Sequence, residues 1–524
     1  MKLCIAEKPS VAKDIAQIIG ATNRFDGYWE GNGYWVSWTY GHLCTLKEPA
    51  DYTPDWKQWN MNVLPMIPDN FGIKVIENGG VKKQFDTIAS LVEKCNEVIN
   101  CGDAGQEGEL IQRWVLSKAK NQKPSKRLWI SSLTKEAIEE GFANLHKGED
   151  YDNLYAAGTA RAIGDWLLGM NATRLYTLKF GAFKQVFSVG RVQTPTLALI
   201  VERQSEIDNF VSETYYELKT TYRAVDFAGT KGKLSSKEKG EEIIEVIKDE
   251  EFEIKSYIQK EGKELAPSLF DLTSVQVECN KKFGYTAEDT LAHVQHLYEN
   301  KLVTYPRVDT AYLPNDVYPK ISGILKNLAA YRKFTEPLLG KKIRKTSKVF
   351  NDKKVTDHHA IIPTGEDPAK VGLNIDQKKV FDLITRRFIA VFYPDCKVSN
   401  TTVIGEAKKH EFRATGKQIL EPGWRVLFES GKTEKKTEEN EQVMPVFEKG
   451  ERGPHEPELL EKQTKAPSYY TEATLLRAME TAGKQVDDDE MRELMKENGI
   501  GRPSTRASII ETLFRRKYIE RQKK

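Results

Sequence analysis

The sequence is poor in several features that would assign a protein class at once. No apolar run approaches the roughly 20 residues that a helix needs to cross a bilayer, and the first residues lack the apolar stretch of a signal peptide. The six cysteines are scattered without a Cys-x-x-Cys pair, which argues against a zinc ribbon and a disulfide scaffold. No Gly-x-x-x-x-Gly-Lys-Ser/Thr phosphate loop occurs. These absences exclude a membrane protein, and they predict free thiols in a reducing cytoplasm.

An excess of charge of either sign is also lacking. The 524 residues carry a net charge of only +3, with 39% hydrophobic and 30% charged residues. This is a globular composition with room for about three or four domains. The end of the chain differs, because residues 502–524 hold eight Lys/Arg and only two Glu. This basic end is either a surface for phosphate groups or a solvated helix face.

The first ~150 residues predict an α/β unit with two strand–loop–helix segments. In the first, Leu3–Ala6 forms a strand, Ser10 is an N-cap, and a helix runs to Gly20. In the second, a strand over Val98–Asn100 leads into a helix that begins at Leu110. Both loops leave the carboxyl ends of strands that we expect to be parallel, where open α/β sheets place their ligands.

Beyond this unit the pattern alternates between helix-rich and strand-rich stretches. Residues 151–210 and about 270–400 favour helices, whereas the stretches from about 211 and over 400–465 favour strands. From Ser468 onward the chain is helical again, with Ser468 or Thr471 as the first cap. The alternation suggests a chain that leaves one module and later returns to it.

Three acidic residues lie at the expected strand ends, namely Glu7, Asp103 and Glu107. Carboxylates in such positions can hold Mg²⁺, which prefers oxygen ligands and keeps several waters. The alternative is that these acids cap helices, as acids in such loops often do. Spacing alone leaves both readings open.

A second candidate group is Tyr305, with Arg307 two residues further on. In an extended segment the two side chains point to the same side. A phenol with a reference pKa of about 10 is a poor nucleophile unless its anion is stabilised or its proton removed. A guanidinium can stabilise the anion and can also clamp a phosphate. Most tyrosines in such a pattern are packing residues, so Tyr-x-Arg by itself is weak evidence.

Longer motifs follow one another almost from end to end of the chain. They are Ala6–Ser10, Tyr40–Leu43, Gly102–Glu109, Gly164–Leu167, Thr173–Arg174, Ser188–Pro195, Thr304–Arg307, Asp357–Thr364, Thr471–Leu475 and Gly499–Ala507. In this order they resemble the type IA DNA topoisomerases, and among them the bacterial topoisomerase III group. Each motif is modest alone, whereas the whole series is specific.

The resemblance implies a multidomain toroid that combines α/β, α and β parts. A Toprim α/β domain would occupy residues 1–150, and the helical domain with the nucleophilic tyrosine residues 267–399. A helical DNA-gripping domain would take residues 151–212 and 466–524, and a β-rich arch residues 213–266 and 400–465. The chain stops where the family usually continues, so we expect a truncated last domain.

The resemblance also implies roles for individual residues. Tyr305 would attack a phosphate of single-stranded DNA, leaving a 5′-phosphotyrosine and a free 3′-hydroxyl without the use of ATP. Glu7 would lie near the leaving 3′ oxygen, and Lys8 and Arg307 would stabilise the scissile phosphate. His358 would touch DNA or tune the tyrosine. The single-strand groove would be lined by Arg161, Asp165, Arg174, Ser188, Val189, Gly190, Arg191, Val192 and Gln193.

The cofactor and partners implied are Mg²⁺ on Glu7, Asp103 and Glu107, DNA with single-stranded regions, and a helicase or single-strand-binding protein. The enzyme would be a monomer in the bacterial cytoplasm, at the nucleoid, that relaxes negative supercoils and decatenates DNA. One departure concerns the metal: the family loop reads Asp-x-Asp-x-Glu, whereas Gly105 replaces the second acid here. We therefore expect a single, weaker Mg²⁺ site, unless Glu109 compensates.

Two alternative functions and several structural readings remain. A Toprim metal-dependent nuclease explains the three acids but not Tyr305, and an inactive single-strand DNA-binding protein would fit the altered loop. Arg161 and Asp165, four residues apart, could form only a helix ion pair. The remaining expectations are core positions for Trp35, Trp38 and Tyr40, and structural roles for His42 and His359.

Overall fold

The N-terminal unit, residues 1–150, is built on a mixed seven-stranded sheet. The computed structural model describes residues 1–130, 133–182, 185–355, 358–428, 444–482 and 499–522. The strand order is β2-β3-β4-β1-β7-β8-β9, with β1 parallel to both β4 and β7. The strands are β1 Lys2–Ala6, β2 Asn23–Phe25, β3 Tyr28–Gly31, β4 Tyr34–Trp38, β7 Glu97–Cys101, β8 Ser125–Arg127 and β9 His146–Lys147. The carboxyl ends of β4, β1 and β7 therefore meet at one edge of the sheet.

Helices follow the two predicted strands, with small shifts in their starts. Helix α1 (Pro9–Ile19) has Lys8 as its N-cap and Pro9 in its first turn, so the predicted N-cap Ser10 is wrong. Gly20 ends α1 in the left-handed conformation, as expected for a helix stop. The second helix begins at Gln106 rather than Leu110. The other elements of this unit are α2 Pro49–Tyr52, α3 Gly79–Lys94, α4 Gln106–Lys118, α5 Lys135–Ala143, β5 Cys44–Leu46 and β6 Ile73–Val75.

Helices from two distant parts of the chain pack together, namely α7 Gln193–Asp208, α14 Glu472–Thr481 and α16 Pro503–Arg515. Helix α6 (Asp152–Phe180) packs instead on α4 of the N-terminal unit. Thr471 caps α14, because its Oγ1 accepts the Thr474 N–H at 3.2 Å, and this prediction is confirmed. Leu199 of α7 packs on the buried cluster that includes Leu476 and Ile510. The chain does return to a module that it left earlier.

The arch is one antiparallel seven-stranded sheet with the order β15-β12-β13-β14-β11-β10-β16. Its strands come from the two predicted stretches, although β13 begins slightly before residue 400. They are β10 Thr214–Tyr222, β11 Val225–Gly229, β12 Phe252–Glu264, β13 Cys396–Ala407, β14 His410–Glu421, β15 Arg452–Gly453 and β16 Glu456–Gln463. Helix α8 (Lys237–Ile247) packs against β16 and β10.

The tyrosine unit, residues 267–399, is mainly helical. Its helices are α9 Leu272–Phe283, α10 Ala287–Glu299, α11 Ile321–Asn327, α12 Arg332–Thr335 and α13 Ile375–Ala390. One buried apolar cluster runs from this unit into the N-terminal unit, where it includes Ile15 and Leu133. We call the interface between the two units the seam.

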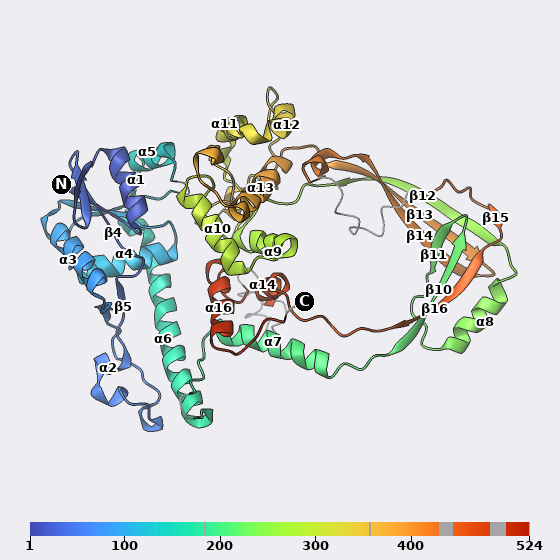
Figure 1. The fold of residues 1–524 in the computed structure, drawn as a ribbon, viewed down its shortest axis with the longest axis horizontal. Helices are drawn as coiled ribbons and strands as arrows, with labels where there is room; N and C mark the ends of the chain where they lie inside the picture. The colour runs from blue at the N-terminus through green and yellow to red at the C-terminus, as the bar shows by residue number, and fades with distance from the viewer. Residues whose placement is uncertain (131–132, 183–184, 356–357, 429–443, 483–498, 523–524) are drawn as a thin grey trace.

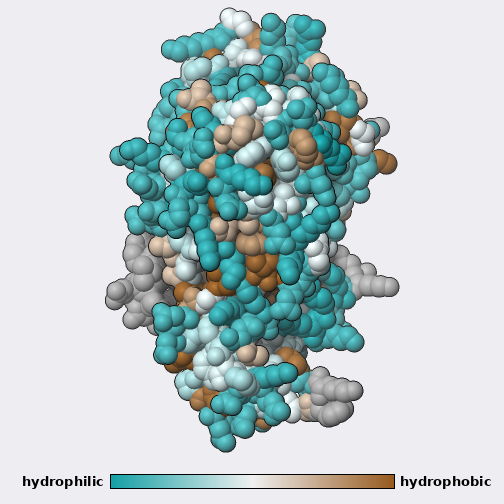
Figure 2. Space-filling view, turned by 90° about the vertical axis from the view of Figure 1, so that its left-hand side faces the viewer, coloured by the Kyte–Doolittle hydropathy of each residue, from teal (hydrophilic) through white to brown (hydrophobic). Residues whose placement is uncertain are grey.

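The chain as a whole follows a ring. Figure 1 shows the arch reaching out from the tyrosine unit and returning toward α7 and α14, with the N-terminal unit at the opposite end. The end face on that side is mostly hydrophilic, with apolar residues in scattered patches (Figure 2). Within the described ranges, no helix is long and apolar enough to cross a membrane. The arrangement agrees with the predicted toroid.

Candidate active site

A cavity of 730 Å³ opens at the seam, where four parts of the chain meet. The N-terminal unit contributes the loops after β1, β4 and β7, and α6 and the start of α16 form another wall. The tyrosine unit contributes the loop that carries Tyr305. The charged and polar lining residues are Glu7, Lys8, Tyr40, His42, Asp103, Gln106, Glu107, Arg161, Asp165, Tyr305, Arg307, Asp309, His358, Arg502, Ser504 and Thr505.

Glu7 and Asp103 are brought together because β1 and β7 are parallel neighbours, with Ala6 opposite Cys101. The Asp103 backbone N–H donates to Glu7 Oε2 at 3.2 Å. Burial and the nearby Asp103 carboxylate raise the pKa of Glu7 to about 7, although Lys8 and Arg307 act in the opposite direction. Glu7 can therefore exchange a proton near neutral pH, as an acid or base in catalysis must.

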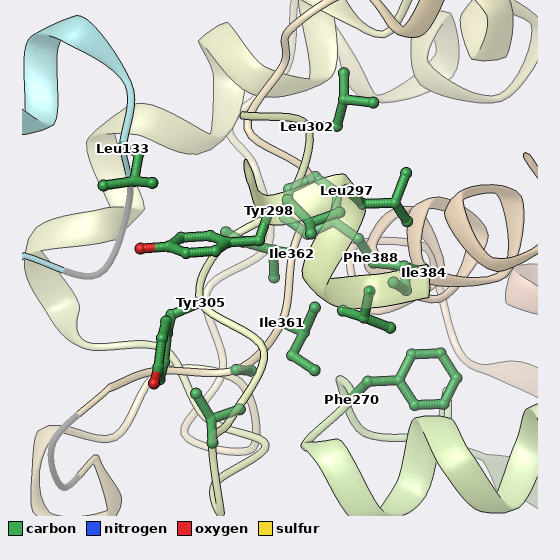
Figure 3. Close-up of a cluster of buried hydrophobic side chains, with 14 of the residues drawn as sticks. Leu133, Phe270, Leu297, Tyr298, Leu302, Tyr305, Ile361, Ile362, Ile384 and Phe388 are labelled. Atoms are coloured by element: carbon green, nitrogen blue, oxygen red, sulfur yellow. The ribbon is translucent and has the colours of Figure 1, made fainter. Parts of the chain in front are cut away.

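Tyr305 reaches the same carboxylates from the tyrosine unit. Its side chain is only 8% exposed, and it lines the cavity together with Asp103 and Glu7. Burial and Asp103 raise the pKa of Tyr305 well above its usual value, while Arg307 lowers it. Figure 3 shows Tyr305 at the edge of the buried cluster, away from Phe270 and Phe388. The resting phenol is neutral, with a proton acceptor already in place.

His358 forms a flat contact with the tyrosine. Its ring stacks on Tyr305 at 4.2 Å with an interplanar angle of 29°, and Trp129 lies on it in turn at 6.4 Å. Its Nε2 is hydrogen-bonded to the Ala104 carbonyl across the seam. Burial lowers the pKa of His358 to about 3, so the ring is neutral at physiological pH. The ring therefore lies against the tyrosine, and its predicted role, to touch DNA or to tune the tyrosine, stays a prediction.

We predict that acid destabilises the chain partly through His358. The pKa of its imidazole is about 3 in the folded chain and roughly 6.5 when unfolded, so the unfolded state binds more protons below pH 6.5. The linked stability is complete above pH 6.5, and about 2 kcal/mol of it is lost by pH 5. Thermal unfolding should therefore shift less between pH 7 and pH 5 in His358→Gln than in wild type. Equal shifts in the two proteins would contradict this prediction.

Comparison with known families gives this cavity its context. The family model described as DNA topoisomerase matches residues 149–524, and the Toprim domain model matches residues 2–133. The chain belongs to the type IA DNA topoisomerase family. Residues 2–133 hold the β1 and β7 loops and residues 149–524 hold Tyr305, so the cavity lies where the two matched regions meet.

Individual relatives agree with this assignment. DNA topoisomerase 3 of Bacillus cereus (strain ATCC 14579) is 40% identical over 545 residues, which cover 99% of this chain and 73% of the relative. The enzyme of the same name from Bacillus subtilis (strain 168) is 36% identical over 533 residues, with the same coverage. Full-length topoisomerase I from Thermotoga maritima shares the fold, with a TM-score of 0.74 and 24% identity over 99% of this chain and 79% of its own.

The third acidic residue of the topoisomerase, Glu107, has a different partner from the other two. Glu107 Oε1 lies 2.6 Å from His42 Nε2, and this bond lowers the pKa of Glu107. Glu109 cannot compensate for Gly105, because it is buried and ion-paired with Arg127 at 3.0 Å. Among the described residues, no three acidic, histidine or cysteine side chains form a ready metal cluster.

The donor chemistry nevertheless suits one divalent ion. Glu7 and Asp103 are two adjacent oxygen ligands whose mutual repulsion raises the pKa of Glu7, and a cation would relieve that repulsion. Mg²⁺ commonly takes one or two carboxylates and completes its coordination with water and phosphate oxygens. The predicted site over Glu7, Asp103 and Glu107 stays a prediction, in which Glu107 would have to leave His42.

Restoring the family's second acid at position 105 is expected to destabilise the loop. Gly105 has φ 154° and ψ 170°, a region that is open essentially only to glycine. Gly105→Asp should therefore lower the free energy of unfolding by about 1–3 kcal/mol. The dependence of DNA cleavage on the Mg²⁺ concentration should not become steeper. Gly105→Ala is the matched control, because it imposes the same strain without a carboxylate. Equal melting temperatures for Gly105→Asp and wild type would disprove the strain.

The residues predicted to line the single-strand groove divide into two groups. Arg161 and Asp165 line the cavity, yet they are 3.9 Å apart, and Asp165 pairs more closely with Arg191 at 2.8 Å. Arg174 does not line the cavity. It is buried and donates to the Trp56 carbonyl at 2.7 Å.

The segment 188–193 lies between α6 and α7, and protein acceptors already satisfy its first three backbone N–H groups. Ser188 donates to Tyr518 Oη at 2.9 Å, Val189 to Thr173 Oγ1 at 3.0 Å, and Gly190 to Thr194 Oγ1 at 3.1 Å. Val192 is the N-cap residue of α7, and Gln193 is buried with its amide donating to Ser188 Oγ at 2.9 Å. The role of this segment in DNA binding stays a prediction.

Sequence reasoning missed several residues of the cavity wall. Trp35 and Trp38 pack in the N-terminal clusters as expected, but Tyr40 is 52% exposed and lines the cavity. His42 also lines it, where its Nε2 lies 2.6 Å from Glu107 Oε1, and its predicted structural role stays a prediction. The signal was available: both follow β4, which a parallel sheet places beside the end of β1. Residues 502–505 also line the cavity; they begin the basic end, for which the sequence analysis leaves a phosphate surface and a solvated helix face open.

Proposed function

We propose that this topoisomerase opens one DNA strand through Tyr305. The phenol oxygen attacks a phosphodiester, forming the bond from phosphorus to the tyrosine oxygen while the bond to the 3′ oxygen breaks. The phenol proton passes to Asp103, and the departing 3′ oxygen takes a proton from Glu7. Religation runs the same steps in reverse. The observation that carries this proposal is that Tyr305 lines one cavity with Asp103 and Glu7, whose charges act on its phenol.

The phosphate itself would be held by Lys8 and Arg307. Arg307 is exposed in the cavity wall and forms no ion pair among the described residues, so its planar guanidinium is available to a phosphate. Lys8 Nζ pairs with Glu299 of α10 at 3.4 Å across the seam. A phosphate would compete with Glu299 for Lys8. DNA binding would in this way weaken one contact that keeps the seam closed.

Glu7 and Asp103 would hold Mg²⁺, with Glu107 as a third ligand. When bound, the ion would supply positive charge for the phosphate oxygens. The three carboxylates would provide the negative charge and the oxygen ligands of that site. They also lie within reach of the tyrosine proton, so the residues can act both as ligands and as proton carriers at different atoms.

Strand passage requires the seam to part between cleavage and resealing. Besides Lys8–Glu299, it is held by the ion pairs Lys301–Asp14 at 3.0 Å and Lys320–Glu140 at 2.8 Å. We propose that residues 267–399 move as the gate and that the ring bends at the arch. Passage of a second strand through the open seam would relax negative supercoils and decatenate DNA. The energy of the broken bond stays in the phosphotyrosine, so no ATP is needed.

The remaining partners follow from this chemistry. The substrate is DNA with a single-stranded region, which a helicase or single-strand-binding protein would supply. A monomer suffices, because one chain provides every residue of the cavity. The site of action is the bacterial nucleoid in the cytoplasm, where the DNA is.

The test is a trapping assay with end-labelled DNA. Wild-type protein is incubated with Mg²⁺ and single-stranded DNA labelled at the 5′ or, separately, the 3′ end, and is then denatured. We expect label from the 3′ end, and not from the 5′ end, to migrate with the protein, because the tyrosine retains the strand downstream of the break. Cleaved DNA without any adduct would instead favour a metal-dependent nuclease, and binding without cleavage an inactive DNA-binding protein.

A further inference from the structure

The tyrosine unit carries a dense run of exposed basic residues that the cleavage chemistry does not use. Residues 320–354 contain eleven Lys/Arg and two acidic residues, a net charge of +9 in a chain whose total is +3. All eleven are exposed. We call this surface the basic ridge; its members are Lys320, Lys326, Arg332, Lys333, Lys341, Lys342, Arg344, Lys345, Lys348, Lys353 and Lys354.

Most of this charge is not neutralised by the protein. Among the described residues, only Lys320 and Arg344 of the ridge form ion pairs, with Glu140 at 2.8 Å and Asp395 at 2.6 Å. The other nine cations repel one another, which raises the free energy of the folded chain. A solvated face usually mixes charges of both signs, so this surface is better explained by an anionic partner.

The backbone beneath the ridge is firmly held. Tyr318 Oη donates to the Ile343 carbonyl at 2.7 Å, and the Asn315 N–H donates to Asp352 at 2.7 Å. Tyr393 Oη donates to the Phe334 carbonyl at 2.7 Å. The cations therefore stand on a fixed platform rather than on a loose loop, and a fixed platform can present them together to a rigid polyanion.

The ridge is suited to phosphates rather than to bases. Nine of its cations are lysines, which bind phosphate as point charges, and only two are arginines. Within the described part of residues 320–354, no aromatic or large apolar side chain is exposed. Proteins that hold single strands without sequence preference normally add aromatic side chains on which bases stack. Duplex DNA, whose outside is phosphate, is the better fit.

The position of the ridge connects it with the gate. In Figure 1, α11 and α12 lie at the outer rim of the molecule. Helices α10 and α13 lie between them and the helices α9 and α14. The corresponding upper end of the molecule is mostly hydrophilic (Figure 2). Lys320, at the start of the ridge, pairs with Glu140 across the seam. DNA bound along the ridge would lie outside the ring and beside the seam through which a strand must pass.

We propose that the basic ridge binds the phosphate backbone of duplex DNA outside the cleavage cavity. The duplex is either a second DNA segment waiting to pass or the flank of the cleaved molecule, since both present the same chemistry. This inference rests on the proposed function for its purpose, but the binding of duplex DNA does not depend on Tyr305.

The test compares two fourfold variants. The ridge variant carries Lys326→Gln, Lys341→Gln, Lys342→Gln and Lys348→Gln. The matched control carries Lys231→Gln, Lys239→Gln, Lys409→Gln and Lys449→Gln, four exposed lysines of the arch that also form no ion pair among the described residues. Binding of a blunt linear duplex is titrated with KCl for each protein, and cleavage of a short single-stranded oligonucleotide is followed in parallel.

We expect the ridge variant alone to lose duplex affinity by at least about tenfold at 0.15 M salt, with a salt slope less steep by about 3. Its cleavage of the short oligonucleotide should equal wild type, and its relaxation of plasmid DNA should fall with duplex affinity. Equal duplex affinity for the ridge variant and wild type, or an equal loss in the arch control, would overturn the inference. Failure of wild type to cleave the oligonucleotide would refute the proposed function instead.

A competition arm separates the two sources of duplex. The substrate is a single strand with one duplex arm, and a separate linear duplex is added as competitor. If the ridge holds a second segment, the competitor should slow relaxation without reducing cleavage of the armed substrate. If it holds the flank, the ridge variant should cleave the armed substrate more weakly than wild type. Either result supports the ridge as a duplex site, and neither effect appearing would count against it.

Discussion

Replacing Tyr305 by phenylalanine is expected to abolish the covalent protein–DNA adduct and plasmid relaxation, a loss of at least about four orders of magnitude in rate. The side chain keeps its shape and its contact with His358, whereas the attacking oxygen is lost. Tyr305 is buried and the substitution removes only its hydroxyl, so stability should change little. Binding of single-stranded DNA, measured by fluorescence anisotropy, should match wild type.

Tyr298→Phe is the matched control for this substitution. Tyr298 is also buried, its ring lies 5.4 Å from that of Tyr305, and burial and Asp103 raise its pKa as well. It does not line the cavity. The adduct should form normally in Tyr298→Phe. An adduct that persists in Tyr305→Phe and disappears in Tyr298→Phe would show that Tyr298 is the nucleophile, and it would refute the assignment of Tyr305.

The part of the site that could be predicted from sequence is local. Glu7 and Asp103 each follow a short apolar strand and precede a helix, and neighbouring parallel strands bring such loops to one edge. The structure has this arrangement, since β1 pairs with β7. Strand ends are visible in a sequence because the apolar run stops and turn residues begin. The meeting of Glu7 and Asp103 at one edge of the sheet could therefore be predicted without knowledge of contacts between distant segments.

The remaining part depends on contacts between distant segments. Nothing in the residues around Tyr305 says that it faces Asp103, since the seam is formed by packing of two separate units into one apolar cluster. The same holds for Glu109, which spacing alone left as a metal ligand. It points instead to Arg127 and Arg113. Tertiary structure determines which buried residues pair, and the hydrophobic periodicity of the sequence does not indicate these pairs.

Arg127 is the second position at which a single change should have a large effect. Its side chain is fully buried at the end of β8, below the loop that carries Asp103. Nη1 donates to the Gly102 carbonyl at 2.6 Å and Nη2 to the Asp103 carbonyl at 2.8 Å. Nε lies 3.0 Å from Glu109 Oε2, an ion-pair contact rather than an aligned hydrogen bond. One guanidinium thus holds the catalytic loop and balances a buried carboxylate.

Arg127→Met should lower the free energy of unfolding by about 3 kcal/mol, because the buried Glu109 loses its fully buried partner and keeps only the partly exposed Arg113. The Asp103 loop also loses two donors, so adduct formation should fall further than the loss of folded protein explains. Both quantities can be measured on one preparation, by urea denaturation and by the trapping assay.

Two companion variants separate charge from packing. Arg113 also pairs with Glu109, at 2.8 Å, but it is partly exposed, so Arg113→Met should cost only about 1 kcal/mol. Adding Glu109→Leu to Arg127→Met should recover part of the stability, since the buried carboxylate that lost its buried partner is gone. It should not recover adduct formation, because the loop carbonyls still lack their donor. Recovery of both together would mean that Arg127 serves only to neutralise Glu109, and that the Asp103 loop keeps its shape without it.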